Sequence, residues 1–208
     1  MKTVLITGGN GSIAKGIARV LAPTHKYLVL VPGREVLDVT SYPNIFNYMI
    51  DKKPNILINC AGFISPSPVL EASIREVQED IFINYLGPYM CTREALKNGC
   101  STIINIGSTS GFEGRANWSA YCSSKAALVA FTESLAKEGV EAYGIHPART
   151  KSKMRERLFP GEDQTKLMEP ERIGEFVLEA LNGKFNSGEQ VIITKDSYKI
   201  LPMRVCPK

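Results

Sequence analysis

The sequence has few of the residues that build metal sites, disulfide frameworks or nucleic-acid interfaces. Only 2 of its 208 residues are histidine, His25 and His146, and its 5 cysteines include no Cys-x-x-Cys pair. An odd number of scattered cysteines argues against a disulfide framework and fits reduced thiols in the cytoplasm. The net charge is only +4, and no arginine-rich run is interleaved with aromatic residues. We therefore expect a cytoplasmic protein with two structural histidines, no metal site and no nucleic-acid partner.

Long apolar runs are also missing. No stretch is long enough to cross a bilayer, and the start of the chain leads directly into the strand-like VLIT of residues 4–7 instead of resembling a signal peptide. A hydrophobic content of 44% and a charged content of 22% are ordinary for a globular protein of this length. We expect no membrane association and one domain with one buried core.

Apolar runs do alternate with segments of helical periodicity, which predicts an α/β fold with a Rossmann-like, doubly wound parallel sheet. The expected strands are 3–6, 27–31, 55–59, 102–106, 140–145 and 190–194. The expected helices are 13–21, 74–97, 119–137 and 171–181. Repeats and linkers are absent, so we assign a single domain to residues 1–194 and a polar C-terminal tail to residues 195–208.

Tyr121 and Lys125, with Ser108 thirteen residues upstream, form the most informative pattern. Residues four apart on a helix share one face, so the ammonium can lower the tyrosine pKa from about 10 toward neutral pH. Such a tyrosine can exchange a proton with an alcohol or carbonyl, while a serine anchors the substrate oxygen. Tyr48 and Lys52 have the same spacing but no other motif around them, so a Tyr-x-x-x-Lys pair alone is weak evidence for such a site.

The other motifs resemble those of short-chain dehydrogenases/reductases, in order and spacing, from Thr3 to about Val191. They are TGGNGSIA at 7–14, LDVT at 37–40, NCAG at 59–62, NYLGP at 84–88, INIGSTSG at 104–111, YCSSKAAL at 121–128 and HPARTKSKM at 146–154. The resemblance implies an NAD(P)-dependent oxidoreductase that interconverts a carbonyl and a secondary alcohol on a small molecule. Tyr121 would be the acid/base, and Lys125 would tune it and bind the nicotinamide ribose. Ser108 would orient the substrate oxygen, and Asn84 would complete the proton relay.

The glycine-rich motif joins a strand to a helix, where small residues let the backbone approach a pyrophosphate. The resemblance puts Gly8, Asn10, Gly11, Ser12 and Ile13 on the cofactor. The spacing of Gly8 and Gly11 also fits nucleotide-sugar epimerases and dehydratases, which remain an alternative. Too little chain follows Lys125 to build the additional substrate domain of such enzymes.

The resemblance assigns further cofactor contacts downstream. Asp38 and Val39 would lie at the adenine, Asn59, Ala61 and Gly62 at the adenosine and ribose, and Pro147, Thr150 and Ser152 at the nicotinamide. Arg34 follows the second strand and suits a 2′-phosphate, which favours NADP(H). The neighbouring Glu35 keeps NAD(H) as an alternative.

One interval is unusually short. Only residues 32–36 separate the second strand from Leu37 and Asp38, whereas a parallel crossover needs a dozen or more residues. We expect a compact family member that lacks one helix/strand unit here and has about six strands. Pro32, Arg34, Glu35 and Pro43 are candidates for blunting the edge that this loss uncovers.

Two surfaces suggest partners. Residues 149–157 carry five basic side chains against Glu156 alone, which indicates a solvated basic face or an anionic substrate. The helices 74–97 and 119–137 have apolar residues on more than one face, and the family pairs such helices between subunits. We expect a homodimer or homotetramer. A non-catalytic NAD(P)-sensing protein is a third reading, disfavoured by the complete set Ser108, Tyr121 and Lys125.

Overall fold

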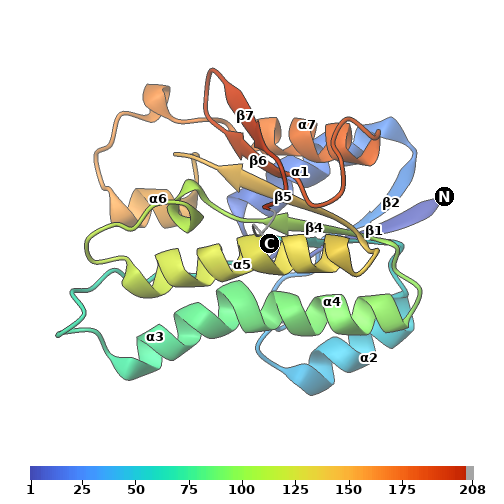
Figure 1. Cartoon of the computed structure of the whole chain (residues 1–208), viewed down its shortest axis with the longest axis horizontal. Coiled ribbons are helices and arrows are strands. Elements are labelled where there is room, and N and C mark those ends of the chain that lie inside the picture. The colour runs from blue at the N-terminus through green and yellow to red at the C-terminus, as the bar shows by residue number, and fades with distance from the viewer. Residues whose placement is uncertain (205–208) are drawn as a thin grey trace.

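The sheet lies between two layers of helices in the computed structural model, which describes residues 1–204 (Figure 1). Its strand order is β2-β1-β3-β4-β5-β6-β7, and the first six strands are parallel. The strands are β1 (Lys2–Ile6), β2 (Tyr27–Leu30), β3 (Ile56–Asn59), β4 (Thr102–Ile106), β5 (Glu141–Pro147), β6 (Gln190–Ile193) and β7 (Tyr198–Leu201). The predicted Rossmann-like α/β class is confirmed.

The helices divide between the two faces of the sheet (Figure 1). They are α1 (Ser12–Leu21), α2 (Tyr42–Lys52), α3 (Ile74–Ile81), α4 (Gly87–Lys97), α5 (Ser119–Lys137), α6 (Lys153–Leu158) and α7 (Pro170–Leu181). Core residues of α1 and α7 cluster on one face, and those of α2, α4 and α5 on the other. No helix within residues 1–204 combines the length and apolar character that a membrane crossing requires.

The two cores follow from the two-residue period of the strands. Val4 and Ile6 of β1 belong to the core beneath α1 and α7, whereas Leu5 belongs to the opposite core. Adjacent strands repeat this alternation, with Ile58 on the first face and Leu57 on the second. Both faces of the central strands are therefore buried, which explains their nearly continuous apolar sequences.

The shortened interval is confirmed: residues 31–38 contain neither a helix nor a strand, and β2 forms an edge of the sheet. The chain instead continues into α2, which the sequence analysis missed. Ile45 and Met49, one helical turn apart, are fully buried against the sheet. Pro43 lies in the first turn of α2, where proline is tolerated, and its role at the sheet edge stays a prediction.

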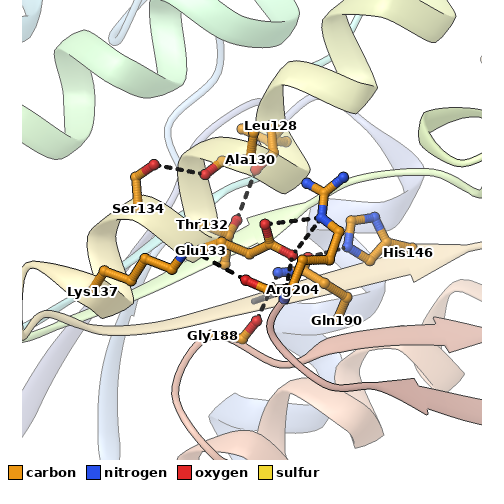
Figure 2. A network of polar contacts seen from close by, with 10 residues as sticks. All are labelled: Leu128, Ala130, Thr132, Glu133, Ser134, Lys137, His146, Gly188, Gln190 and Arg204. Atoms are coloured by element: carbon orange, nitrogen blue, oxygen red, sulfur yellow. Dashed lines mark hydrogen bonds and ion pairs between the residues drawn. The ribbon is translucent and has the colours of Figure 1, made fainter. Parts of the chain in front are cut away.

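The expectation of about six strands is corrected to seven, because part of the presumed tail is ordered. Residues 198–201 form β7, which pairs antiparallel with β6 and covers the edge of that buried strand. The chain then reaches α5, where Arg204 Nε contacts the two carboxylate oxygens of Glu133 at 2.9 and 3.0 Å (Figure 2). A four-residue strand beside polar residues carries too short a pattern to be distinguished from a tail. Residues 205–208 of that expected tail lie outside the described part.

The predicted helix 74–97 is continuous in direction but not in hydrogen bonding. A π-helical segment, Phe82–Leu86, separates α3 from α4. A π-helical segment of this length adds one residue to a single turn of an α-helix, and such segments often occur at functional sites. Asn84 lies inside this segment and is fully buried.

Candidate active site

The candidate site lies at the carboxyl ends of the parallel strands, where the order reverses between β1 and β3. Open α/β sheets bind ligands at such a switch point. A cavity of about 330 Å³ opens there. Its walls comprise Gly8, Asn10–Ala14, Arg34, Leu37–Thr40, Cys60–Phe63, Ile83, Ile106, Gly107, Tyr121, Lys125 and Ser152–Met154.

The glycine-rich loop is tied to the end of β3. Gly8 has φ +74°, and a Cβ built there would lie 2.7 Å from Ala61 Cα. Thr7 Oγ1 accepts hydrogen bonds from the backbone N–H groups of Cys60 and Ala61 at 3.0 and 3.1 Å. Only glycine fits position 8, because a side chain would be both strained and obstructed.

The amino terminus of α1 forms the floor of the cavity. Gly11 is its N-cap and offers no side-chain cap, so the first N–H groups of the helix have no capping acceptor. Ser12, Ile13 and Ala14 line the cavity at this end. Unpaired N–H groups and the helix dipole favour an anion, so the residues present fit the pyrophosphate of a dinucleotide.

The segment after β2 forms another wall of the cavity, and its side chains alternate between the core and a more exposed position. Leu37 and Val39 are buried in the core, and Asp38 is anchored between them. Although burial opposes it, hydrogen bonds from Thr40 and the Arg34 charge hold the pKa of Asp38 below its ordinary value. Arg34 Nε lies 3.4 Å from Asp38 Oδ2, and its side chain is 66% exposed, so the guanidinium can reach an incoming ligand.

The neighbouring Glu35 is held differently. Its carboxylate accepts a hydrogen bond from Asn10 Nδ2 at 3.1 Å. A hydrogen bond with its own backbone, together with the one from Asn10, lowers the pKa of Glu35. A hydrogen bond thus holds the Glu35 carboxylate against the glycine-rich loop, next to Arg34 in the sequence.

Ser108, Tyr121 and Lys125 meet where this cavity adjoins a second one. The second cavity has about 370 Å³ and extends over residues 107–110, Trp118 and the segment 147–158. Tyr121 lines both cavities, Lys125 only the first and Ser108 only the second. The three predicted side chains are therefore brought together at one boundary.

Burial dominates the electrostatics of this boundary. Desolvation raises the pKa of Tyr121 to about 12, despite an opposing interaction with the Ser108 side chain. Desolvation also lowers the pKa of Lys125 to about 8. Lys125 is 4% exposed, and its Nζ donates to the Ile106 carbonyl at 3.1 Å. The expected lowering of the tyrosine pKa is wrong, because burial disfavours the phenolate and raises the pKa instead.

Hydrogen bonds to Phe63 and Asp80 hold Asn84 in a fixed orientation. Its Oδ1 accepts from Phe63 N at 3.0 Å, and its Nδ2 donates to Phe63 O at 2.8 Å. The same Nδ2 donates to Asp80 Oδ1 at 2.5 Å. Sequence reasoning missed Asp80; its signal was an acidic residue one helical turn before Asn84, on a face otherwise expected to be apolar.

Asn59 does not reach the cavity, contrary to expectation. It is 2% exposed, and its Nδ2 donates to Thr92 Oγ1 at 3.0 Å and to Asn105 Oδ1 at 2.8 Å. Asn105 in turn donates to Thr132 of α5 at 2.9 Å. This buried chain of amides and hydroxyls joins β3, α4, β4 and α5 behind the site, so Asn59 supports the wall from within.

The segment after β5 serves mainly the second cavity. Pro147 and Thr150 line only that cavity, whereas Ser152 lines both and caps α6 by accepting from Arg155 N at 3.1 Å. His146 is fully buried against Gly107 and contacts Gln190 at 2.7 Å (Figure 2). Burial lowers the pKa of His146 to about 4, in keeping with the structural role expected for it.

The basic stretch 149–157 is partly neutralised by carboxylates that follow it in the sequence. Arg155 forms two hydrogen bonds of 2.6 Å with Glu162, and Lys151 pairs with Glu169. Within residues 1–204, Arg149 and Arg115 form no ion pair, and both line the second cavity. These two arginines therefore leave positive charge available to a ligand in the second cavity.

Comparison with known proteins gives a consistent assignment. A family model described as short chain dehydrogenase matches residues 36–163. The chain is 35% identical over 144 residues to a 3-oxoacyl-(acyl-carrier-protein) reductase of Aquifex aeolicus, covering 65% of this chain and 57% of that protein. It is 40% identical over 115 residues to 2-dehydro-3-deoxy-L-rhamnonate dehydrogenase (NAD(+)) of a Sphingomonas species, covering 51% and 46%. The matches thus span about half the length of these two relatives.

The fold also matches solved structures. A variant of actinorhodin polyketide ketoreductase with NADPH superposes with a TM-score of 0.84 at 20% identity, covering 93% of this chain and 96% of that chain. At this identity the similarity establishes the fold alone.

Gly8→Ala tests the close approach between the loop and β3. The free energy of unfolding of the variant should be lower than that of the wild type by about 2–4 kcal/mol, because the alanine is strained in the left-handed region and overpacked against Ala61. Chemical denaturation measures the difference. Gly139→Ala is the matched control: Gly139 has φ +85° but nothing within 4 Å of a Cβ, so it isolates the strain. Equal losses in the two variants would show that the contact with Ala61 contributes nothing.

Proposed function

Because the chain belongs to the short-chain dehydrogenase family, we propose that it transfers hydride between a nicotinamide cofactor and a small carbonyl or secondary alcohol. One observation carries the proposal: Tyr121 forms part of the wall between two cavities, with Lys125 on one side and Ser108 on the other. A proton donor at such a boundary can serve a substrate in one cavity while its tuning group contacts a cofactor in the other.

The first cavity suits the cofactor, which supplies or accepts hydride when bound. The amino terminus of α1 would hold the pyrophosphate, with Gly8 allowing the backbone to approach it. Gly62 and Ala61 would lie along the ribose, and Lys125 would donate to the nicotinamide ribose hydroxyls. Ser152 reaches both cavities and would hold the carboxamide near the substrate.

The second cavity suits the substrate. Ser108 would donate to the substrate oxygen, and Tyr121 would transfer a proton to it as the carbonyl becomes an alcohol. The raised pKa of Tyr121 keeps the phenol protonated at neutral pH, which fits a general acid for carbonyl reduction. The Lys125 ammonium would stabilise the phenolate formed when the proton leaves.

The cofactor we propose is NADP(H), and NAD(H) should bind with lower affinity. An exposed Arg34 at the adenine end can pair with a 2′-phosphate, and a guanidinium suits phosphate oxygens. Glu35 beside it could accept from ribose hydroxyls, which would favour NAD(H). The relatives include both types, since one name specifies NAD(+) and one structure contains NADPH.

We propose further that the substrate carries an anionic group. Arg115 and Arg149 line the second cavity together with a single acidic residue, Glu113. Arginine binds carboxylates bidentately, and a desolvated cavity strengthens that attraction.

The chain should also assemble through the outer face of α4 and α5. Tyr85, Tyr89 and Phe131 form an aromatic cluster, with 5.3 Å between the ring centroids of Tyr89 and Phe131. Tyr89 is 43% exposed, and a groove of about 500 Å³ runs beside it over Ala127 and Ala130. We propose that a second copy packs here in an isologous homodimer, as the family resemblance implies.

Tyr121→Phe tests the mechanism. The variant loses its proton donor but keeps its ring, so turnover should fall by about two to four orders of magnitude while cofactor affinity is retained. The assay uses matched carbonyl compounds with and without a carboxylate, and the anionic members should have the lower KM. Tyr48→Phe is the control, since Tyr48 has the same spacing to Lys52 and lies outside both cavities. Near-normal turnover by Tyr121→Phe would remove this residue from its role.

Arg34→Ala tests the cofactor preference. Loss of a charge-assisted contact should weaken NADPH binding about 10- to 100-fold and leave NADH binding nearly unchanged. Fluorescence titration of both cofactors against both proteins measures this. Arg19→Ala is the control, because Arg19 pairs with Glu171 outside the cavity. An equal loss for the two cofactors would defeat the NADP(H) preference.

Phe131→Glu tests assembly. A charge in the aromatic cluster should convert a dimer or tetramer to a smaller species, which light scattering at micromolar concentration would detect. Phe46→Glu places the same charge on an aromatic residue of α2 that is 41% exposed and lies outside this cluster, and it should leave the mass unchanged. A monomeric wild-type protein would contradict the proposed interface.

A further inference from the structure

Asp80 is a buried carboxylate beside the candidate site whose charge lacks a direct counter-ion. It is 1% exposed at the end of α3, and within residues 1–204 it forms no ion pair. Its Oδ1 accepts from Asn84 Nδ2 at 2.5 Å, and its Oδ2 accepts from Ser65 N at 3.2 Å. A buried carboxylate is costly unless nearby charges and donors compensate it.

Asn84 connects this carboxylate to the lysine end of the site. Both of its amide hydrogens are used, one by Phe63 O and one by Asp80, and its Oδ1 accepts from Phe63 N. One lone pair of Oδ1 is left. A Cβ built on Gly62 would lie 3.4 Å from that Oδ1 and 3.9 Å from Lys125 Nζ, so both groups face the same backbone position.

We infer that Asp80 is a positioning residue for Lys125: it orients the Asn84 amide and supplies the negative charge that keeps the buried ammonium protonated. The inference rests on the proposed function only where it concerns turnover. Its structural part concerns Lys125 itself and can be measured without a substrate.

The charges around Asp80 agree with this role. Desolvation raises the pKa of Asp80 to about 6, opposed by its hydrogen bonds and by Lys125. The Cys60 thiol and the Asp80 carboxylate both raise the pKa of Lys125, and Asp80 also raises that of Tyr121. Burial raises the pKa of Cys60 to about 12, so near pH 8 that thiol is neutral and Asp80 is the group that carries a negative charge. The other titratable groups near it are Glu79, which raises the pKa of Asp80, and Glu76, which accepts from Ser65 Oγ at 2.9 Å. Lys125 is therefore the basic group that faces Asp80.

The ionisation of Asp80 determines the direction in which its removal shifts the pKa of Lys125. Above about pH 6 Asp80 is ionised and stabilises the protonated Lys125. Removing the charge in Asp80→Asn should lower the pKa values of Lys125 and Tyr121 together, by about one unit. The alkaline limb of the pH profile for carbonyl reduction should move to lower pH, because the reaction needs both protons in place.

Lysine titration by NMR tests the inference on the full chain. Protein labelled with carbon-13 at the lysine ε-carbons is titrated, and the Lys125 resonance is assigned by its loss in Lys125→Met. In Asp80→Asn the Lys125 midpoint should fall by about one unit. In Glu79→Gln, which removes a neighbouring charge that makes no hydrogen bond or ion pair within residues 1–204, it should hardly move. An unchanged midpoint in Asp80→Asn, or equal shifts in the two variants, overturns the inference.

Two further readouts separate the possible failures. If Asp80→Asn does not fold, the wild-type resonance decides: it should show a second, smaller inflection near pH 6 from Asp80, and a single inflection overturns the inference. Suppose that the wild-type protein reduces a carbonyl compound and Tyr121→Phe does not. An unshifted alkaline limb in Asp80→Asn then refutes the role of Asp80 and leaves the proposed function intact. If wild type turns over nothing, the proposed function fails and the lysine titration still decides for Asp80.

Discussion

The burial of the Lys125 ammonium is the constraint on which the site depends. Its side chain is 4% exposed, and loss of hydration draws its pKa down to about 8, so the protein must compensate the charge from within. The Ile106 carbonyl at the end of β4 accepts a hydrogen bond from the ammonium. The buried carboxylate of Asp80 offsets positive charge through space and accepts a hydrogen bond from Asn84, whose Oδ1 faces Gly62 together with Lys125 Nζ. Strand ends, the π-helical segment and α5 all converge on this one cation.

The short interval after β2 leaves the site intact because it lies at the sheet edge, one strand away from the switch point between β1 and β3. Ligand-binding loops leave β1, β3, β4 and β5, and each of these strands has parallel neighbours on both sides. Thr7 joins the ends of β1 and β3 through two hydrogen bonds, independently of the sheet edge. Only the adenine wall depends on the shortened region, where Leu37 and Val39 anchor a short segment that would otherwise be a loop.

Much of the site could be predicted because its signals are local. A tyrosine and a lysine one helical turn apart share a face in any α-helix, and a glycine-rich strand-to-helix turn has one geometry. Asn59 was misplaced because a polar residue at a strand end can face either a cavity or a buried amide, and the partners Thr92 and Asn105 are distant in sequence. The pairing of Arg155 with Glu162 was missed because the carboxylate lies beyond the next helical turn.

The sequence by itself determined the order of elements, the two-sided burial of the strands and the side chains available for chemistry, since these depend on short-range periodicity and residue type. Tertiary structure alone decided that Tyr121 separates two cavities, that residues 198–201 complete the sheet, and that Asp80 hydrogen-bonds to Asn84. It also reversed the expected pKa direction of Tyr121. Desolvation and pairing depend on what surrounds a group in three dimensions, and spacing along the chain does not specify those surroundings.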